Sequence, residues 1–163
     1  MAADALKIEG GSAEQLRDSI NAAGWASDRV VCACIARQGH SPSIAGAILL
    51  YGLAALLLPG SRLLPRTFVL AASAERVFAF KARGLAVGER DYRVTVYPGE
   101  EASWPRGEVS MSPAKAGMTA NGWLEVPGDK GPARIRCAAP NSQVNPALEQ
   151  TIALLGANGD ATP

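Results

Sequence analysis

Residues 65–84 read PRTFVLAASAERVFAFKARG, and this stretch decides the class of fold. It holds two runs rich in β-branched and aromatic residues, RTFVLAAS and ERVFAFKA, with a tight connection at residues 73–75 between them. Two such runs joined by so few residues are typical of antiparallel strands in a hairpin. The sequence therefore predicts an antiparallel β-sheet built around this hairpin.

Further short strands are expected after the hairpin, because runs of strand-forming residues alternate with turn signals. YRVTVY alternates apolar and polar positions until Pro98-Gly99, where we expect the strand to end. A turn separates EASW from GEVSMS, and PGDKGP separates MTANGWLEV from ARIRCA. In ARIRCA the isoleucine and the cysteine alternate with two arginines, as in a sheet with one wet face.

One more strand and two helices complete the pattern. Before the hairpin, the apolar run RVVCACIAR predicts a buried strand. Near the N-terminus, Ser12 and Gln15 can form a capping box for an amphipathic helix that ends at Gly24. Near the C-terminus, NPALEQTIALLG predicts a second amphipathic helix with Asn145 as its cap.

This order of elements resembles the pleckstrin-homology-like (PH-like) family. In that family a strongly bent antiparallel sheet closes nearly into a barrel, and a C-terminal helix plugs one open end. Residues 65–84 resemble the family's second and third strands, and the topology matches over residues 29–156. The chain is more similar to bacterial PH-like domains than to eukaryotic ones, because its C-terminal helix lacks a Trp and its first inter-strand connection is apolar.

The resemblance implies an α+β fold: a PH-like, strongly bent antiparallel barrel of about seven strands with a C-terminal capping helix. An extra N-terminal helix and an apolar helical insertion between the first two strands would be added to it. We expect an N-terminal helix and linker, a PH-like domain that contains the insertion, and a flexible tail, over residues 1–28, 29–156 (insertion 41–60) and 157–163.

The composition fits one folded domain without a strong overall field. The 163 residues are 48% hydrophobic and 19% charged, and the formal net charge is +1. We therefore expect no nucleic-acid partner. The N-terminal MAADALKIEGG has neither the basic region nor the apolar core of a secretory signal, and Cys32 and Cys34 are expected to be reduced. These features favour a cytoplasmic location.

An apolar segment lies between the first strand and the hairpin. From Ile44 to Leu58, fifteen residues carry no charge, and no Asp or Glu occurs between Val30 and Ala74. A helix of that length reaches about 22 Å, whereas the hydrocarbon core of a bilayer is about 30 Å thick, so we do not expect it to span a membrane. A helix that is apolar on all sides still has to be covered by something.

Two hypotheses explain what shields the apolar segment from water. In the first, the protein is a non-enzymatic module that holds to anionic lipid at the inner face of the plasma membrane, where the apolar side chains insert and flanking arginines bind lipid phosphates. In the second, the same segment is a protein interface, in a homo-oligomer or with a partner. The candidate contact residues are the same in both: Ile44, Ile48, Leu49, Leu50, Tyr51, Leu53, Leu56, Leu57, Arg37, Arg62 and Arg66.

An enzyme is the less favoured interpretation. His40 is the single histidine, and the acid-free window around it supplies no carboxylate to orient it as a base. His40, Cys32, Cys34 and Cys137 match no common zinc spacing, so buried thiols are the expected role of the cysteines. We assign no catalytic residue, no metal ligand and no cofactor.

The expected role of each tryptophan follows from the strand or helix on or beside which it lies. Trp104 and Trp123 fall on expected strands, where core packing is the ordinary role. Trp25 follows the first helix, so two roles are open: it packs that helix onto the sheet, or it lies at a membrane surface.

Overall fold

The computed structural model describes residues 4–9, 12–39, 64, 66–87, 91–114, 120–140 and 144–156. Within these ranges there are two α-helices, one short 3-10 helix and eight strands. The helices are α1 (Ala13–Ala23), η1 (Arg106–Glu108) and α4 (Asn145–Gly156). The strands are β1 (Leu6–Glu9), β2 (Cys32–Gln38), β3 (Thr67–Ala72), β4 (Arg76–Val87), β5 (Asp91–Pro105), β6 (Ser110–Pro113), β7 (Asn121–Val126) and β8 (Ala133–Ala138).

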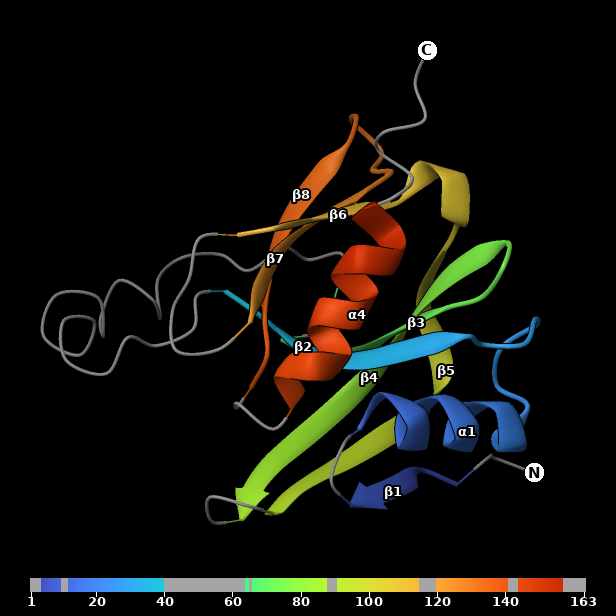
Figure 1. The fold of residues 1–163 in the computed structure, drawn as a ribbon. Coiled ribbons are helices and arrows are strands. Elements are labelled where there is room, and N and C mark those ends of the chain that lie inside the picture. The colour runs from blue at the N-terminus through green and yellow to red at the C-terminus, as the bar shows by residue number, and fades with distance from the viewer. Residues whose placement is uncertain are drawn as a thin grey trace, which may run out of the picture.

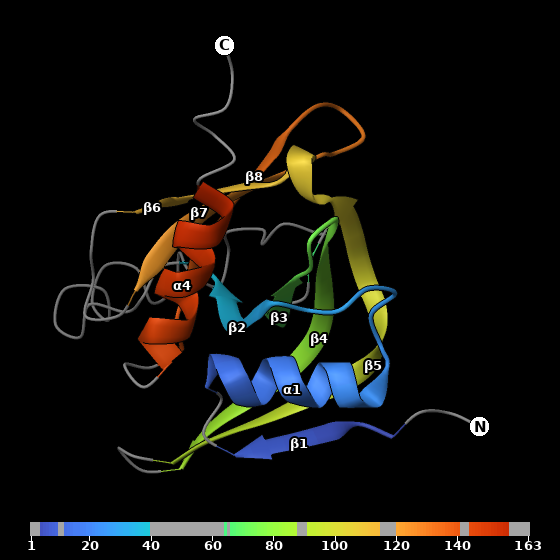
Figure 2. The same cartoon turned by 45° about the vertical axis from the view of Figure 1, so that its right-hand side comes forward.

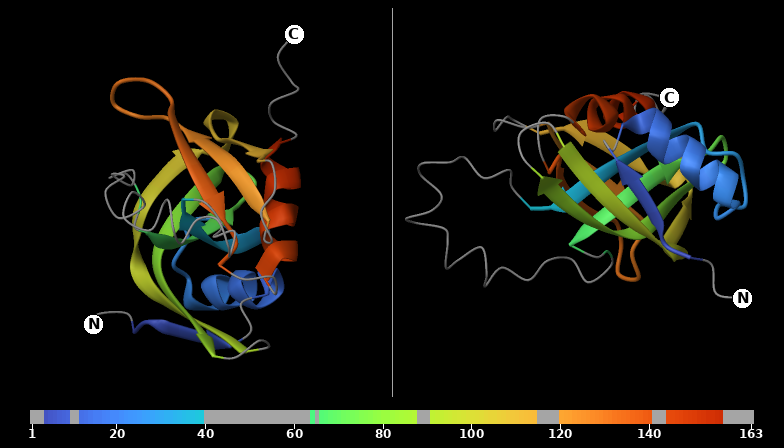
Figure 3. Two further views of the ribbon diagram at one scale, coloured as in Figure 1. Left: turned by 90° about the vertical axis from the view of Figure 1, so that its left-hand side faces the viewer. Right: turned by 90° about the horizontal axis from the view of Figure 1, so that it is seen from below.

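All eight strands belong to one antiparallel sheet in the order β1-β5-β4-β3-β2-β8-β7-β6. The sheet is strongly curved, as Figures 1 and 3 show. Because β1 and β6 are its two outer strands, the sheet is not closed within the described residues. The expected α+β class is confirmed, and the sheet holds one strand more than the seven expected.

The β3–β4 hairpin forms where the sequence predicts it, and a buried serine organises its turn. The backbone N–H of Ser73 donates to the carbonyl of Arg76 at 2.8 Å. The hydroxyl of Ser73 accepts from the backbone N–H groups of Glu75 and Arg76 at 3.2 and 2.9 Å. The hydroxyl of Ser73 therefore accepts hydrogen bonds from two backbone N–H groups in the turn that lack a partner on a neighbouring strand.

The central strands are buried on both faces. Ile35, Val69 and Phe80 lie opposite one another in the register of β2, β3 and β4, so they share one face of the sheet. The neighbouring set on the other face includes Cys34 and Leu70. All five side chains are fully buried. This double burial explains why these strands read as continuous apolar runs.

The two helices cover the sheet through β2, which both of them contact. The N-terminus of α1 carries the predicted capping box of Ser12 and Gln15, and Gly24 ends the helix with φ 64° in the left-handed region. The buried face of α1 includes Leu16 and Ile20. In α4 the largest buried side chains are Leu148 and Leu155, and this helix packs across β2, β6 and β7.

Two sequence-based expectations about strands were wrong. β1 was not among the expected strands, although its sequence LKIE alternates apolar and charged residues, because a run of four residues is at the lower limit at which alternation indicates a strand. β1 pairs with β5 beneath α1 (Figure 2). The expected break at Pro98-Gly99 does not occur, because β5 continues through both residues by a β-bulge in which Gly99 has φ 98°.

The start of α4 is tied to the sheet by a side chain for which the sequence suggested a different role. Asn145 was expected to cap the helix, and α4 does begin at Asn145. Its Oδ1, however, accepts a hydrogen bond from the backbone N–H of Ala120 at 2.8 Å. This bond fixes the first turn of α4 against the start of β7.

Candidate lipid- or partner-binding site

Most of the predicted contact residues fall outside the described residues. These are the eight members of the apolar segment and one of the three arginines: Ile44, Ile48, Leu49, Leu50, Tyr51, Leu53, Leu56, Leu57 and Arg62. The structure does describe the two places where the chain leaves β2 and returns to β3. It therefore defines the base from which residues 40–63 depart.

Gln38, the last residue of β2, holds this base together. Its side-chain Nε2 donates to the carbonyl of Leu64 at 2.5 Å, and its backbone N–H donates to the carbonyl of Arg66 at 2.9 Å. Leu64 is itself buried, with 5% of its surface exposed. The chain therefore leaves the sheet and returns to it at one place.

The other two predicted arginines lie at this base. Arg37 is exposed on β2, opposite Thr67 of β3 on one side and Ala138 of β8 on the other. Arg66 is exposed and immediately precedes β3. The fold thus places Arg37 and Arg66 at the two strand ends on either side of residues 40–63. Because Arg66 lies opposite Gln38 and Thr67 lies opposite Arg37, the two arginines are on opposite faces of the β2–β3 pair.

A second group of cations, which was not among the predicted contact residues, lies on β8 against Trp123 of β7. The guanidinium carbons of Arg134 and Arg136 lie 4.5 and 5.4 Å from the centroid of the Trp123 ring. Trp123 is half-buried, so the expected core role for this residue was wrong. The sequence signal for this group was the alternation in ARIRCA, which placed Arg134 and Arg136 on the solvent-facing side of the sheet.

The other two tryptophans pack against the core. Trp104 is buried on β5. The ring of Trp25 lies 6.0 Å from that of Phe80 and is half-buried, as the helix-packing interpretation of Trp25 predicts.

The cysteines are free thiols held within the fold. Burial raises the pKa of Cys34 to about 12 and also raises the pKa of Cys137. Cys32 is half-buried, and its sulfur lies 3.3 Å from the hydroxyl of Thr151 in α4. Since the thiolate is the reactive form, the two buried thiols are poor nucleophiles at neutral pH. His40 lies outside the described residues.

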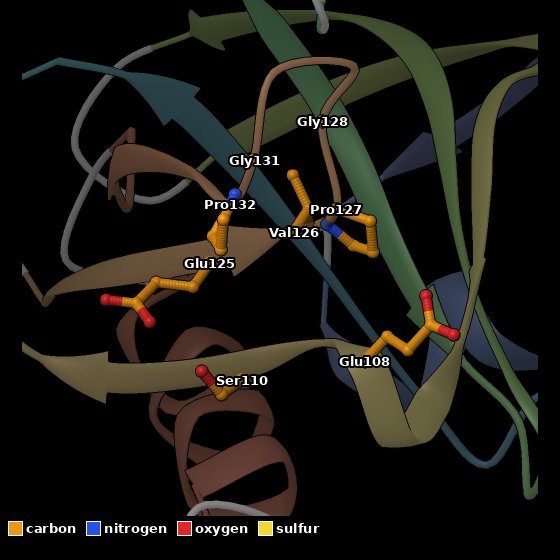
Figure 4. A pocket seen from close by; sticks show the side chains of 8 residues that line it. All are labelled: Glu108, Ser110, Glu125, Val126, Pro127, Gly128, Gly131 and Pro132. Carbon is orange, nitrogen blue, oxygen red and sulfur yellow. The ribbon is translucent and has the colours of Figure 1, made fainter.

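Two shallow pockets are present on the described surface. One, of about 390 Å³, lies between η1–β6 and the β7–β8 turn, with Glu108 and Glu125 on opposite sides and Ser110 between them (Figure 4). The other, of about 470 Å³, lies between β1 and α1 and is lined mainly by polar side chains. Within the part of the chain that the structure describes, no three His, Cys, Asp or Glu residues are grouped so that they could hold a metal ion.

The described surface is poor in apolar side chains. Among the residues that the structure describes, Val31 is the one exposed large apolar residue, at 47%. None of the helices in those ranges combines the length and apolarity needed to cross a membrane.

Comparison with known proteins does not assign the chain to a family. The chain matches no model of a protein family, and no curated protein matches it.

Proposed function

We propose that the protein is a non-enzymatic, PH-like interaction module that holds to anionic membrane surfaces. Residues 44–58 insert into the lipid interface, and the arginines beside them bind lipid phosphates. The observation that carries this proposal is the pairing at the base: Gln38 binds the carbonyls of both Leu64 and Arg66, which places Arg37 and Arg66 beside the point where the apolar segment leaves the sheet.

The arrangement of the elements supports the PH-like part of the proposal. The strand β2, which begins the expected domain, is a neighbour of its last strand, β8. The C-terminal helix α4 packs across β2, β6 and β7, where a helix that plugs the end of a bent sheet would lie. In this interpretation β1 and α1 are additions to the family's pattern.

The energies are adequate for a peripheral attachment. Each basic residue near an anionic leaflet contributes about 1 kcal/mol. Each large apolar side chain that leaves water contributes roughly 1.5–3 kcal/mol. Two or three arginines and four or five apolar side chains would therefore hold the protein at a surface without a spanning helix.

The thiols support a role without catalysis. The raised pKa values of Cys34 and Cys137 keep both sulfurs protonated at neutral pH, which removes the two buried cysteines as nucleophiles.

The experiment is co-sedimentation of the purified protein with phosphatidylserine–phosphatidylcholine vesicles and with phosphatidylcholine vesicles, at low and high salt. We expect pelleting with the anionic vesicles only, weakened by salt because charge contacts at a surface are screened. The variant Arg37→Glu/Arg66→Glu should lose most of this binding. Lys81→Glu/Arg83→Glu is the matched control, because both residues are exposed on β4 and Lys81 lies on the face opposite Arg37.

The same samples are measured by light scattering. A defined oligomer that ignores both kinds of vesicle would overturn the membrane proposal and would make residues 44–58 a protein interface instead.

A further inference from the structure

The outer face of three neighbouring strands, β1, β5 and β4, is rich in cations. The core-facing residues of these strands include Ile8, Val94 and Ala82, which are buried, and α1 lies over that side of β1 and β5 (Figure 2). Side chains alternate along a strand, so the residues between them point outward. The cations on the outward side are all exposed: Lys7 on β1, Arg93 on β5, and Lys81 and Arg83 on β4.

These cations lie on both sides of β5, the middle strand of the three. In the register, Thr95 of β5 lies between Lys7 of β1 and Arg83 of β4. Neighbouring strands are about 4.8 Å apart, so the three side chains form one short row across the sheet. Arg93 and Tyr97 lie two residues before and after Thr95 and therefore share its face.

Tyr97 adds an aromatic ring to this face. Nζ of Lys81 lies 5.9 Å from the centroid of the Tyr97 ring, so the two side chains are on the same side of the sheet. The tyrosine is half-buried, which leaves part of its ring open to solvent. The name basic patch is used below for six residues: Lys7, Lys81, Arg83, Arg93, Thr95 and Tyr97.

Acidic side chains offset only part of the charge of the basic patch. Oε1 of Glu9 lies 3.8 Å from Nε of Arg93, and these side chains are 83% and 63% exposed, so the pair contributes only about 0–1 kcal/mol. Along β5 the patch has an acidic residue beyond each end, because Asp91 precedes Arg93 by two residues and Glu100 and Glu101 follow the β-bulge. Between these limits, four cations face one carboxylate among the side chains that the structure describes.

We propose that the basic patch binds single-stranded nucleic acid, with the strand running along β5. The cations on either side of β5 contact its phosphates, and a base stacks on the ring of Tyr97. The hydroxyl of Thr95 is placed to donate a hydrogen bond to a phosphate or a sugar. This inference does not rest on the proposed function, because the patch shares no residue with the predicted lipid- or partner-binding set.

The shape of the patch and its ring favour this occupant over other anions. Neither of the two pockets described above includes a residue of β4 or β5, so the patch is an open track and not a cleft for a small anion. An acidic protein segment would use the cations but would leave the ring without a role. The expected absence of a nucleic-acid partner followed from the net charge of +1, which averages over all faces of the molecule and does not report a local excess.

The test measures binding to fluorescent oligo-dT and oligo-rU by anisotropy at several salt concentrations. The probes have about 15 nucleotides, because a site of this kind covers roughly 4–16. With four phosphate contacts, the logarithm of the binding constant should fall with the logarithm of the salt concentration with a slope of about −3. Lys81→Gln/Arg83→Gln should weaken binding at low salt by at least about 10-fold and make the slope shallower by about 1.4.

A matched control removes two cations from other surfaces. Arg29 lies on the loop between α1 and β2, Lys130 lies in the turn between β7 and β8, and both are exposed. Arg29→Gln/Lys130→Gln should change the affinity by less than about 3-fold, since only charges close to a bound strand act on it strongly. A fall equal to that of Lys81→Gln/Arg83→Gln would refute the assignment to this patch.

The role of the ring is tested by two substitutions. Tyr97→Leu should weaken binding of both oligonucleotides by at least about 5-fold, whereas Tyr97→Phe keeps the ring and should bind as the wild type does. Inorganic polyphosphate has no bases, so Tyr97→Leu should bind it as well as the wild type does. Circular dichroism checks that each variant is folded. Equal losses for polyphosphate and for the oligonucleotides in Tyr97→Leu would contradict stacking and overturn the inference.

Vesicles separate this inference from the proposed function. Lys81→Gln/Arg83→Gln should bind phosphatidylserine vesicles as the wild type does. Loss of vesicle binding in that variant, with oligonucleotide binding intact, would assign the patch to the membrane and refute its role with nucleic acid. A wild type that binds neither oligonucleotide at low salt would also refute it and would leave the proposed function standing. Failure of the wild type to bind vesicles bears on the proposed function alone.

Discussion

The side-chain amide of Gln38 donates to the backbone carbonyl of Leu64 at 2.5 Å, across 26 residues of chain. The bond closes the base of the apolar segment on the side of β3, and the backbone N–H of Gln38 closes it again through Arg66. A single residue at the end of a strand thus sets where a long connection returns to the sheet. The positions of Arg37 and Arg66 on either side of this connection depend on it.

Gln38→Ala should therefore destabilise the protein. The substitution leaves the carbonyl of a buried residue without this donor, which costs about 1–2 kcal/mol in the free energy of unfolding. Urea unfolding measures the change, and Gln150→Ala, at an exposed position of α4, is the control for the loss of an amide. Equal unfolding midpoints for the two variants would mean that the bond to Leu64 contributes nothing.

Replacing Asn21 should cost more stability than replacing Gln38, because the side chain of Asn21 makes two hydrogen bonds to one buried residue. Its Nδ2 donates to the carbonyl of Val30 at 2.9 Å, and its Oδ1 accepts from the N–H of Val30 at 2.8 Å. These bonds join α1 to the approach to β2. Asn21→Ala should lower the free energy of unfolding by about 2–4 kcal/mol, since both backbone groups of Val30 lose their partner.

Asn21→Asp is the graded comparison in the same urea experiment. It keeps the acceptor for the N–H of Val30, but it replaces the donor with a carboxylate oxygen that faces the carbonyl of Val30, so at neutral pH it should be less stable than the wild type. An alanine variant that is as stable as the wild type would contradict the role of this pair.

The features that the sequence predicted correctly are local ones. The turn at Ser73 and the cap of α1 at Ser12 depend on neighbouring residues, so the pattern of the chain is enough to place them. The pairing of β2 with β8, which brings Arg37 near Arg136, joins distant segments and leaves no mark in either one. Trp123 was misassigned for the same reason, because its partners come from the next strand.

The candidate site likewise has one part that the sequence indicated and one part that only the fold shows. The sequence indicated the apolar segment and the arginines on either side of it, and the fold places two of these, Arg37 and Arg66, at the neighbouring ends of β2 and β3. The contact of Trp123 with Arg134 and Arg136 could not have been predicted, because it requires the register of β7 against β8. Alternation along one strand shows which face a residue occupies, but it does not show which strand lies beside it.

Gly99 tests the bulge that lets β5 continue. Its φ of 98° lies in the region that side chains avoid, and no atom lies within 4 Å of the place that a Cβ would take. Gly99→Ala should therefore lose about 1–2 kcal/mol from backbone strain alone. Gly107→Ala is the matched control, since its surroundings are equally open and its φ is not positive. Thermal or urea unfolding that ranks Gly107→Ala as the less stable variant would refute this explanation of the bulge.

The raised pKa of Cys34 should make the free energy of unfolding fall at alkaline pH. Burial raises its pKa to about 12, whereas an exposed thiol titrates near 9.0. Above about pH 9 the unfolded chain releases a proton that the folded protein keeps, so the folded state loses stability as the pH rises toward 12. The loss should be about 1.4 kcal/mol per pH unit for each cysteine buried in this way. At neutral pH both states are protonated, and this contribution is constant.

Cys34→Ala isolates that contribution. The variant is compared with the wild type at each pH, so that contributions common to both proteins cancel. The stability of the variant, measured by urea unfolding under reducing conditions, should fall less steeply by about 1.4 kcal/mol per pH unit between about pH 9 and pH 11. The wild type and the variant should then converge as the pH rises, even though the variant begins lower because it lacks the buried sulfur. Two parallel curves would mean that Cys34 releases its proton equally in both states, and hence that the thiol is not buried in solution.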